Sequence, residues 1–325
     1  MLSKQALENV LCHPSAEVRS LALAVLVSSA STSRPYSADA LVLLREHIPR
    51  YHSDPDAKFR HEVLGHTKTM AGRIYGALAV LRRTAAQRRA VTAVGWTGEV
   101  RSTGEGKSSP GEQARLPILP PYPNVEVLQD SLDRHDEFLG WYITFLRNEL
   151  TPTASYQRHI TALKATATIL TLGKDTPGGP DGFNVTADSI FRDVTWIRSI
   201  LDLTMDNFDD VREAATAVLA SFPDNAISAP LAGERKGSGL TLHDILHEFC
   251  IRADSHASRT ARADHADGAA RARGLLCKWT KGSGATITFL RNVLDALEAK
   301  LSLAEEDLGR AAIGNPVHGA FASVR

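Results

Sequence analysis

Cysteine is scarce in this 325-residue chain. Its three cysteines, Cys12, Cys250 and Cys277, are too few and too scattered for a disulfide framework, which fits a reducing compartment. Long apolar runs are missing as well: none approaches the ~18 residues that a membrane span needs. The start of the chain shows no charged-then-apolar signal pattern. We therefore expect a cytoplasmic protein without a membrane span.

Net charge and enzyme motifs are also lacking. Lys+Arg and Asp+Glu both number 37, so the overall charge favours no class of partner. There is no GxSxG, and no cysteine stands in a recognisable nucleophile context. The stretch "TGEGKSS" (Thr103–Ser109) resembles the end of a phosphate-binding loop, but Arg101 stands where its first glycine is needed and no buried strand precedes it. The residues give no support for catalysis, and we expect this chain to hold no cofactor.

A histidine pair offers one alternative. In "HDILHEFC", His243 and His247 are four residues apart on one helical face, and Cys250 follows one turn later. Such groups can bind zinc, but the hydrolytic motif needs Glu directly after the first His, where this chain has Asp244. A packed or surface histidine pair is the favoured interpretation, and a metal enzyme using these three residues is kept as the least supported one.

The stretch "DNFDDVREAATAVL", from Asp206 to Leu219, has the pattern of a helix start. Asp206 or Asn207 is the expected N-cap, and Asp209 and Asp210 lie where the helix dipole favours negative charge. One apolar face follows, made of Val211, Ala214, Ala215, Val218 and Leu219. The acids therefore predict the beginning of a buried helix rather than a catalytic cluster.

The same design recurs along the chain, with a polar opening followed by an apolar residue and an arginine. The pairs are Val18-Arg19, Phe59-Arg60, Val211-Arg212 and Ala270-Arg271. The first two arginines are 41 residues apart, within the ~40–47 period of HEAT and armadillo repeats. We therefore predict an all-α fold, an α-solenoid of HEAT/armadillo-like helical repeats with long loop insertions.

Composition divides the chain further. Helical repeats are expected over 1–97 and 125–325, separated by a flexible loop insertion at 98–124 that is dense in Gly, Pro and Ser, with further loops at 173–186 and 223–239. The expected helices cover 15–30, 38–52, 57–94, 125–150, 154–172, 187–205, 209–222, 242–253, 266–278 and 285–300.

Two basic stretches are candidates for RNA binding. No acid occurs between Val63 and Gly98, but this stretch contains Lys68, Arg73, Arg82, Arg83, Arg88 and Arg89. A second run, Arg252–Lys281, supplies Arg259, Arg262, Arg271 and Arg273. Two interpretations stay open: solvated helix ends, or a surface facing phosphates.

Several longer blocks carry a resemblance to a known family. They are "DPDAKFRHEVLGHTKTMAGRI", "LTPTASYQRHITALKA", "WIRSILDLTMDNFDDVREAATAVL", "RADHADGAARARGLL" and "NPVHGAFASVR". In this order they resemble the thyroid adenoma-associated protein family, whose fungal members are regulatory subunits of a tRNA ribose 2′-O-methyltransferase. Members of that family are far longer than this chain, so the resemblance implies a central piece of such a protein or a truncated gene product.

The resemblance implies a non-catalytic α-solenoid that binds an FtsJ-type methyltransferase. That partner would methylate a ribose in the tRNA anticodon loop, and S-adenosylmethionine would belong to the partner. tRNA itself would be the second partner. The alternative is a generic HEAT-type scaffold for protein partners, without an RNA role.

Overall fold

The computed structural model describes residues 4–93, 125–175, 190–222, 231, 240–260 and 262–279, with a few positions between 291 and 299. Every regular element in these ranges is a helix. The helices are α1 (Lys4–Leu11), α2 (Ala16–Val27), α3 (Ala38–His52), α4 (Ala57–Ala93), α5 (Val125–Glu149), α6 (Tyr156–Asp175), α8 (Val194–Leu203), α9 (Asp209–Ala220), α10 (Leu242–Thr260) and α11 (Ala263–Trp279).

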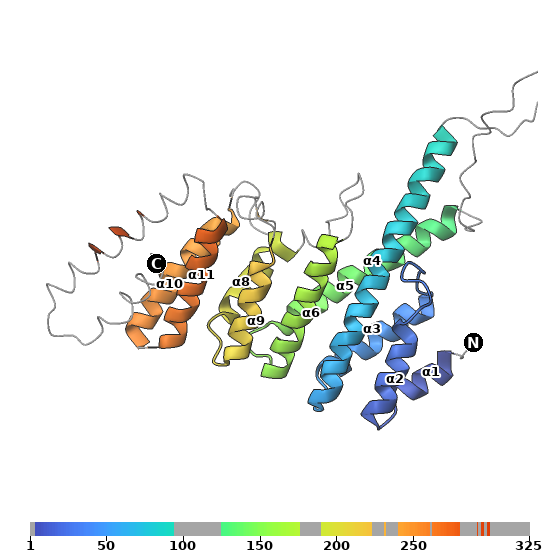
Figure 1. Ribbon diagram of the computed structural model, residues 1–325, viewed down its shortest axis with the longest axis horizontal. Helices are drawn as coiled ribbons and strands as arrows, with labels where there is room; N and C mark the ends of the chain where they lie inside the picture. Colours follow the sequence, from blue (N-terminus) through green and yellow to red (C-terminus); the bar gives the residue numbers. More distant parts are fainter. Residues whose placement is uncertain are drawn as a thin grey trace, which may run out of the picture.

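The helices form successive antiparallel pairs that stack into an elongated array (Figure 1). The pairs are α1–α2, α3–α4, α5–α6, α8–α9 and α10–α11. The second helix of each pair lies in one layer, and these are called the second helices. In this layer α2 contacts α4, α4 contacts α6, α6 contacts α9, and α9 contacts α11. In the other layer α3 contacts both α1 and α5, and α8 contacts α10. The predicted α-solenoid is confirmed.

A shared network of hydrogen bonds marks the start of three second helices. The fourth residue of α2, α4 and α9 is an arginine, and each guanidinium donates to the backbone carbonyl six residues earlier: Arg19 to His13, Arg60 to Asp54, and Arg212 to Asp206. The side chain of that earlier residue in turn accepts a backbone N–H two residues on, from Ser15, Asp56 and Phe208 respectively. Three of the four apolar-Arg pairs of the sequence thus share a defined structural role at a helix start. The fourth, Ala270-Arg271, does not mark a helix start, because it lies in the middle of α11.

The same positions also join neighbouring repeats. Arg19 of α2 forms an ion pair with Asp54 at 2.7 Å, just before α4. In α6 the fourth residue is His159, whose Nδ1 lies 3.4 Å from the carboxylate of Asp206, just before α9. Arg212 of α9 lies 3.9 Å from Asp267 of α11. A cationic or basic group at the start of one second helix therefore faces an acid of the next.

The expected N-cap of α9 was wrong by one or two residues. Phe208 is the cap residue and makes no side-chain cap bond. Asp206 lies before it and accepts the N–H of Phe208 at 2.9 Å, because the arginine network fixes the turn ahead of the helix. At α8 the expected chemistry is found, with Asp193 accepting N–H bonds from Thr195 and Trp196.

The buried side chains form a continuous core from Leu11 to Leu276. The predicted face of α9 is confirmed: Ala214 is partly buried against the core, and the fully buried members are Val211, Ala215, Val218 and Leu219. α1 was missed by the sequence pattern, and α6 continues to Asp175, beyond the expected end at Leu172. The expected insertion 98–124, most of the two later loops and most of the expected helix 285–300 lie outside the described residues.

Candidate nucleic-acid interface

α4 carries the first predicted basic set on a helix of 37 residues, whose C-terminal part extends beyond the ends of its neighbours (Figure 1). Lys68, Arg83 and Arg89 are exposed on it, and none has an ion-pair partner among the described residues. At 3.6 residues per turn, the three side chains lie within an arc of about 120° around the helix. Of the predicted basic set on α4, these three side chains are accessible to a phosphate backbone.

Arg82 is neutralised by an acid that lies far away in the sequence. Its Nη2 contacts both carboxylate oxygens of Asp136 in α5, at 2.7 and 3.0 Å. The stretch that lacks acids in the sequence is therefore not free of them in space, because α5 packs against α4. This ion pair fixes the position of Arg82, while the neighbouring Arg88 is half-buried.

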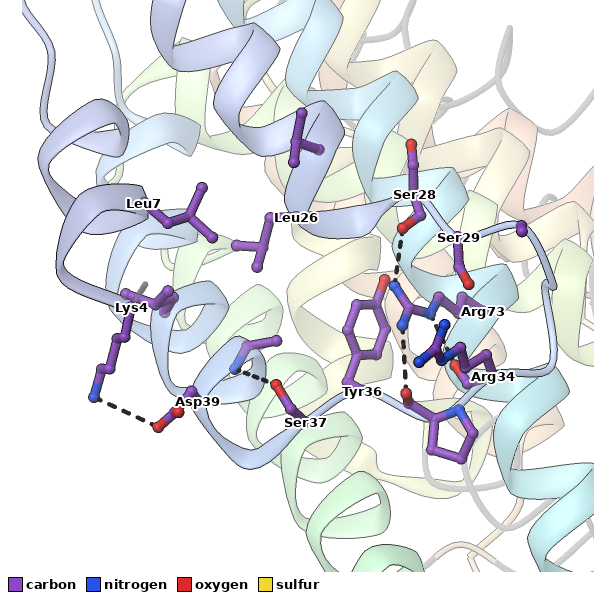
Figure 2. Close-up of a pocket in the computed structure, with 15 residues that line it drawn as sticks. Lys4, Leu7, Leu26, Ser28, Ser29, Arg34, Tyr36, Ser37, Asp39 and Arg73 are labelled. Atoms are coloured by element: carbon purple, nitrogen blue, oxygen red, sulfur yellow. Dashed lines mark hydrogen bonds and ion pairs between the residues drawn. The ribbon is translucent and has the colours of Figure 1, made fainter. Parts of the chain in front are cut away.

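Arg73 is used inside the fold. Its guanidinium donates to the carbonyls of Val27, Ser28, Arg34 and Pro35 at 2.8–3.3 Å. It also stacks over the Tyr36 ring, 3.8 Å from the ring centre (Figure 2). These bonds hold the connection between α2 and α3, so the surface role expected for Arg73 does not fit its position.

The second basic run is largely paired or buried. Arg262 contacts Asp264 and donates to Asn207 at 2.7 Å, and Arg271 donates to Asp267 at 2.9 Å. Arg273 is only 4% exposed, and burial lowers the pKa of its guanidinium. A buried guanidinium cannot meet a phosphate at the surface, so Arg273 does not fit the prediction, and the side chain of Arg259 lies outside the described residues.

The histidine pair does not assemble a metal site. The rings of His243 and His247 stack with centres 6.5 Å apart. Cys250 is buried, its thiol points to the carbonyl of Ala269 at 3.7 Å, and burial raises the thiol pKa to about 12. A metal needs the thiolate, which this environment disfavours. In the described ranges no group of three or more His, Cys, Asp or Glu side chains is placed to hold a metal ion.

A pocket of about 570 Å³ lies at the α1 end of the array (Figure 2). The start of α1, the end of α2 and the start of α3 enclose it, and Leu7, Leu26 and Leu43 supply apolar lining. Lys4 and Asp39 form an ion pair of 3.9 Å at its edge, and Arg34 lies at the opposite side.

Comparison with known proteins decides between the families of helical repeats. A family model described as "Trm732, TPR repeats" matches residues 1–213, from α1 into α9. The chain belongs to the Trm732 TPR-repeat family. No curated protein and no solved structure matches it. The match agrees with the resemblance carried by the sequence blocks, since the Trm732 family is that of a regulatory subunit of a tRNA 2′-O-methyltransferase.

The repeats of the Trm732 family are described as TPR repeats, whereas the arginine spacing in the sequence predicted HEAT or armadillo repeats. Both are antiparallel helix pairs stacked into a solenoid, so the architecture is the same. Membership makes the chain a regulatory helical-repeat protein related to tRNA modification, with a tRNA methyltransferase as its class of partner. No helix in the described residues is both long and apolar enough to cross a membrane.

Proposed function

We propose that this chain is a non-catalytic regulatory subunit that supports 2′-O-ribose methylation of the tRNA anticodon loop by an FtsJ-type methyltransferase. The observation that carries the proposal is the family match over residues 1–213. The partner binds S-adenosylmethionine and carries out the methyl transfer, and the complex works in the cytoplasm.

The helical array suits such a role because stacked helix pairs present long surfaces that can hold two macromolecules at once. On α4, the exposed Lys68, Arg83 and Arg89 would contact tRNA phosphates. Phosphate contacts fix position without reading sequence, so the chain would orient the tRNA while the methyltransferase selects the ribose.

Reconstitution tests the proposal. The purified chain is combined with an FtsJ-type methyltransferase and unmodified tRNA, and methyl transfer from labelled S-adenosylmethionine is followed. We expect transfer into the anticodon loop only when both proteins are present. Undiminished transfer by the methyltransferase alone would remove the regulatory role, and transfer by this chain alone would make it an enzyme.

The alternative is a scaffold for protein partners without an RNA role. It is favoured by the internal use of Arg73, the burial of Arg273 and the Arg82–Asp136 pair, which together reduce the open basic surface. Salt-dependent binding of tRNA by the purified chain separates the two, because a phosphate interface releases counterions and a protein scaffold has none to release.

A further inference from the structure

An exposed aromatic ring stands directly before α9, between two neighbouring repeats. Phe208 is 53% exposed and is the cap residue of the helix, but its side chain makes no cap bond. In the other second helices the residue at this place is polar: Ser15, Asp56, Ser155 and Arg262. A polar cap such as serine or aspartate would stabilise the start of α9 better than phenylalanine does. The stability of the helix therefore does not explain this ring.

The preceding repeat holds the Phe208 ring in place. The ring of Tyr156, at the start of α6, packs on it with the ring centres 4.7 Å apart. The Tyr156 hydroxyl donates to the carboxylate of Asp210 at 3.1 Å. The backbone is fixed as well, since the N–H of Phe208 donates to Asp206 at 2.9 Å and its carbonyl accepts the N–H of Arg212 at 3.1 Å. A ring that is exposed and already ordered loses little conformational entropy when a partner covers it.

Acidic side chains accompany the ring on the surface of α9. Asp209 and Asp210 are exposed, and Glu213, one turn later, is exposed and has no ion-pair partner among the described residues. The single cation of α9, Arg212, is paired with Asp209, and its side chain is only 13% exposed. Such a surface repels the phosphates of RNA and attracts a basic protein surface. The aromatic–acid patch is defined as Phe208, Tyr156, Asp209, Asp210 and Glu213.

One exposed cation lies beside the aromatic–acid patch. Arg262, directly before α11, donates to Asn207 at 2.7 Å. It is also paired with Asp264 in the first turn of α11, which compensates its charge. The patch therefore stays negative.

The start of α4 shows how a ring and a carboxylate together bind an arginine. The guanidinium of Arg19, from α2, lies 4.7 Å from the centre of the Phe59 ring and pairs with Asp54 at 2.7 Å. A guanidinium suits both contacts because it stacks on aromatic faces and matches the geometry of a carboxylate. At Phe208 the preceding repeat supplies Tyr156 instead of an arginine, and half of the Phe208 surface stays open.

We propose that the aromatic–acid patch binds the methyltransferase, through an exposed arginine of that enzyme that stacks on Phe208 and pairs with the acids after it. This inference rests on the proposed function, which supplies the partner. The starts and the ends of the second helices form opposite edges of the array (Figure 1). Phe208 lies at the edge of the starts, whereas Arg83 and Arg89 lie in the C-terminal part of α4. The enzyme and tRNA would thus occupy different surfaces and bind at the same time.

Titration of the full chain with a purified FtsJ-type methyltransferase, followed by calorimetry, tests the proposal. Phe208→Ser should weaken the affinity by at least about tenfold, since an aromatic anchor carries much of the binding energy of an interface. Its melting temperature should change little, because serine can cap α9. Glu213→Lys should also weaken binding and should reduce its dependence on salt. Both variants should bind tRNA like the parent chain.

Two matched controls change similar side chains outside the aromatic–acid patch. Ile251→Ser removes an apolar side chain that is 58% exposed on α10, and Glu46→Lys reverses an exposed acid of α3. Both should bind the methyltransferase like the parent chain.

The outcomes separate this inference from the proposed function. An affinity for the methyltransferase that Phe208→Ser leaves unchanged, or that the controls reduce equally, would overturn the inference and leave the regulatory role intact. If Phe208→Ser lost affinity for tRNA but not for the enzyme, the ring would belong to an RNA interface instead. A parent chain that binds no methyltransferase would overturn both the inference and the proposed function.

Discussion

At the residue scale, two glycines of α4 separated by about one turn differ in what surrounds them. A Cβ on Gly76 would lie 2.6 Å from the backbone oxygen of Thr32, whereas nothing lies within 4 Å of one on Gly72. Gly76 is therefore required by a close approach of the connection between α2 and α3, and Gly72 is not.

Substitution by alanine should change the free energy of unfolding in opposite directions at the two positions. Gly76→Ala must displace backbone, and we expect a loss of about 1–3 kcal/mol in the free energy of unfolding. Gly72→Ala should raise it by up to ~1 kcal/mol, because alanine favours a helix interior more than glycine does. Urea unfolding of both variants checks this, and equal stabilities would show that the contact at Thr32 is absent.

The buried His52 makes stability depend on pH. Its side chain is fully buried, with Nε2 3.4 Å from the Tyr142 hydroxyl, and burial lowers its pKa from 6.5 to about 4. Above pH 6.5 the folded and unfolded chains both hold a neutral imidazole. As the pH falls from 6.5 toward 4, the unfolded chain takes up a proton first, so the folded state loses stability across this window.

His52→Gln should remove part of that loss. The difference in unfolding free energy between about pH 7.5 and about pH 5 should shrink in this variant. His61→Gln is the control, because His61 is exposed. The remaining dependence would come from other histidines whose pKa values burial also lowers, such as His47 and His135. An unchanged dependence in His52→Gln would show that this histidine is protonated in the folded chain.

At the element scale, two consecutive residues of α9 lie on its buried and its exposed side. Val218 is 0% exposed, whereas the neighbouring Ala217 is exposed. Val218→Asp would bury an unpaired charge between helices, and we expect a loss of at least about 3 kcal/mol. Ala217→Asp should cost less than about 1 kcal/mol, since its carboxylate stays in water. Thermal unfolding monitored by circular dichroism distinguishes the two variants. Similar melting temperatures would show that Val218 does not lie on the buried face.

Much of every described helix except α1 followed from the sequence, because apolar spacing reports the buried face directly. The face of α9 and the range of α3 are examples: the pattern predicted 38–52, and the helix is Ala38–His52. The turns were harder. The role of Arg212 depends on a bond to the carbonyl of Asp206 that no side-chain pattern encodes, and this bond displaced the expected cap.

At the scale of the whole molecule, the candidate site was the least predictable part. Arg82 stands in a stretch without acids, but Asp136 reaches it from a helix 54 residues further on. Arg73 reads as a surface cation, yet it bonds to backbone carbonyls near residue 34. Charge density along a sequence cannot show which guanidinium groups are satisfied by distant partners, because those partners are set by packing.

The structure narrows the test of tRNA binding to exposed cations. Replacing Arg83 and Arg89 together by Gln should flatten the salt dependence of tRNA affinity by roughly one unit per lost phosphate contact. Stability should hardly change, because exposed charges contribute little to folding.

The matched control replaces Arg50 and Lys58 by Gln, since both are exposed cations outside the predicted set. We expect its salt slope to equal that of the parent chain. Equal slopes in both double variants would exclude Arg83 and Arg89 from the RNA interface and favour the scaffold role.

The length of α4 has a mechanical consequence. Its 37 residues span about 55 Å, against about 18 Å for the 12 residues of α9. α4 is packed at least as far as Thr84, which is 2% exposed, and its Arg82 is paired with Asp136 of α5. Arg89 lies about 8 Å further along the helix axis. Because α4 continues as one helix to Ala93, this charge sits on a short stiff extension of the array and moves with the contact between α4 and α5 as one body.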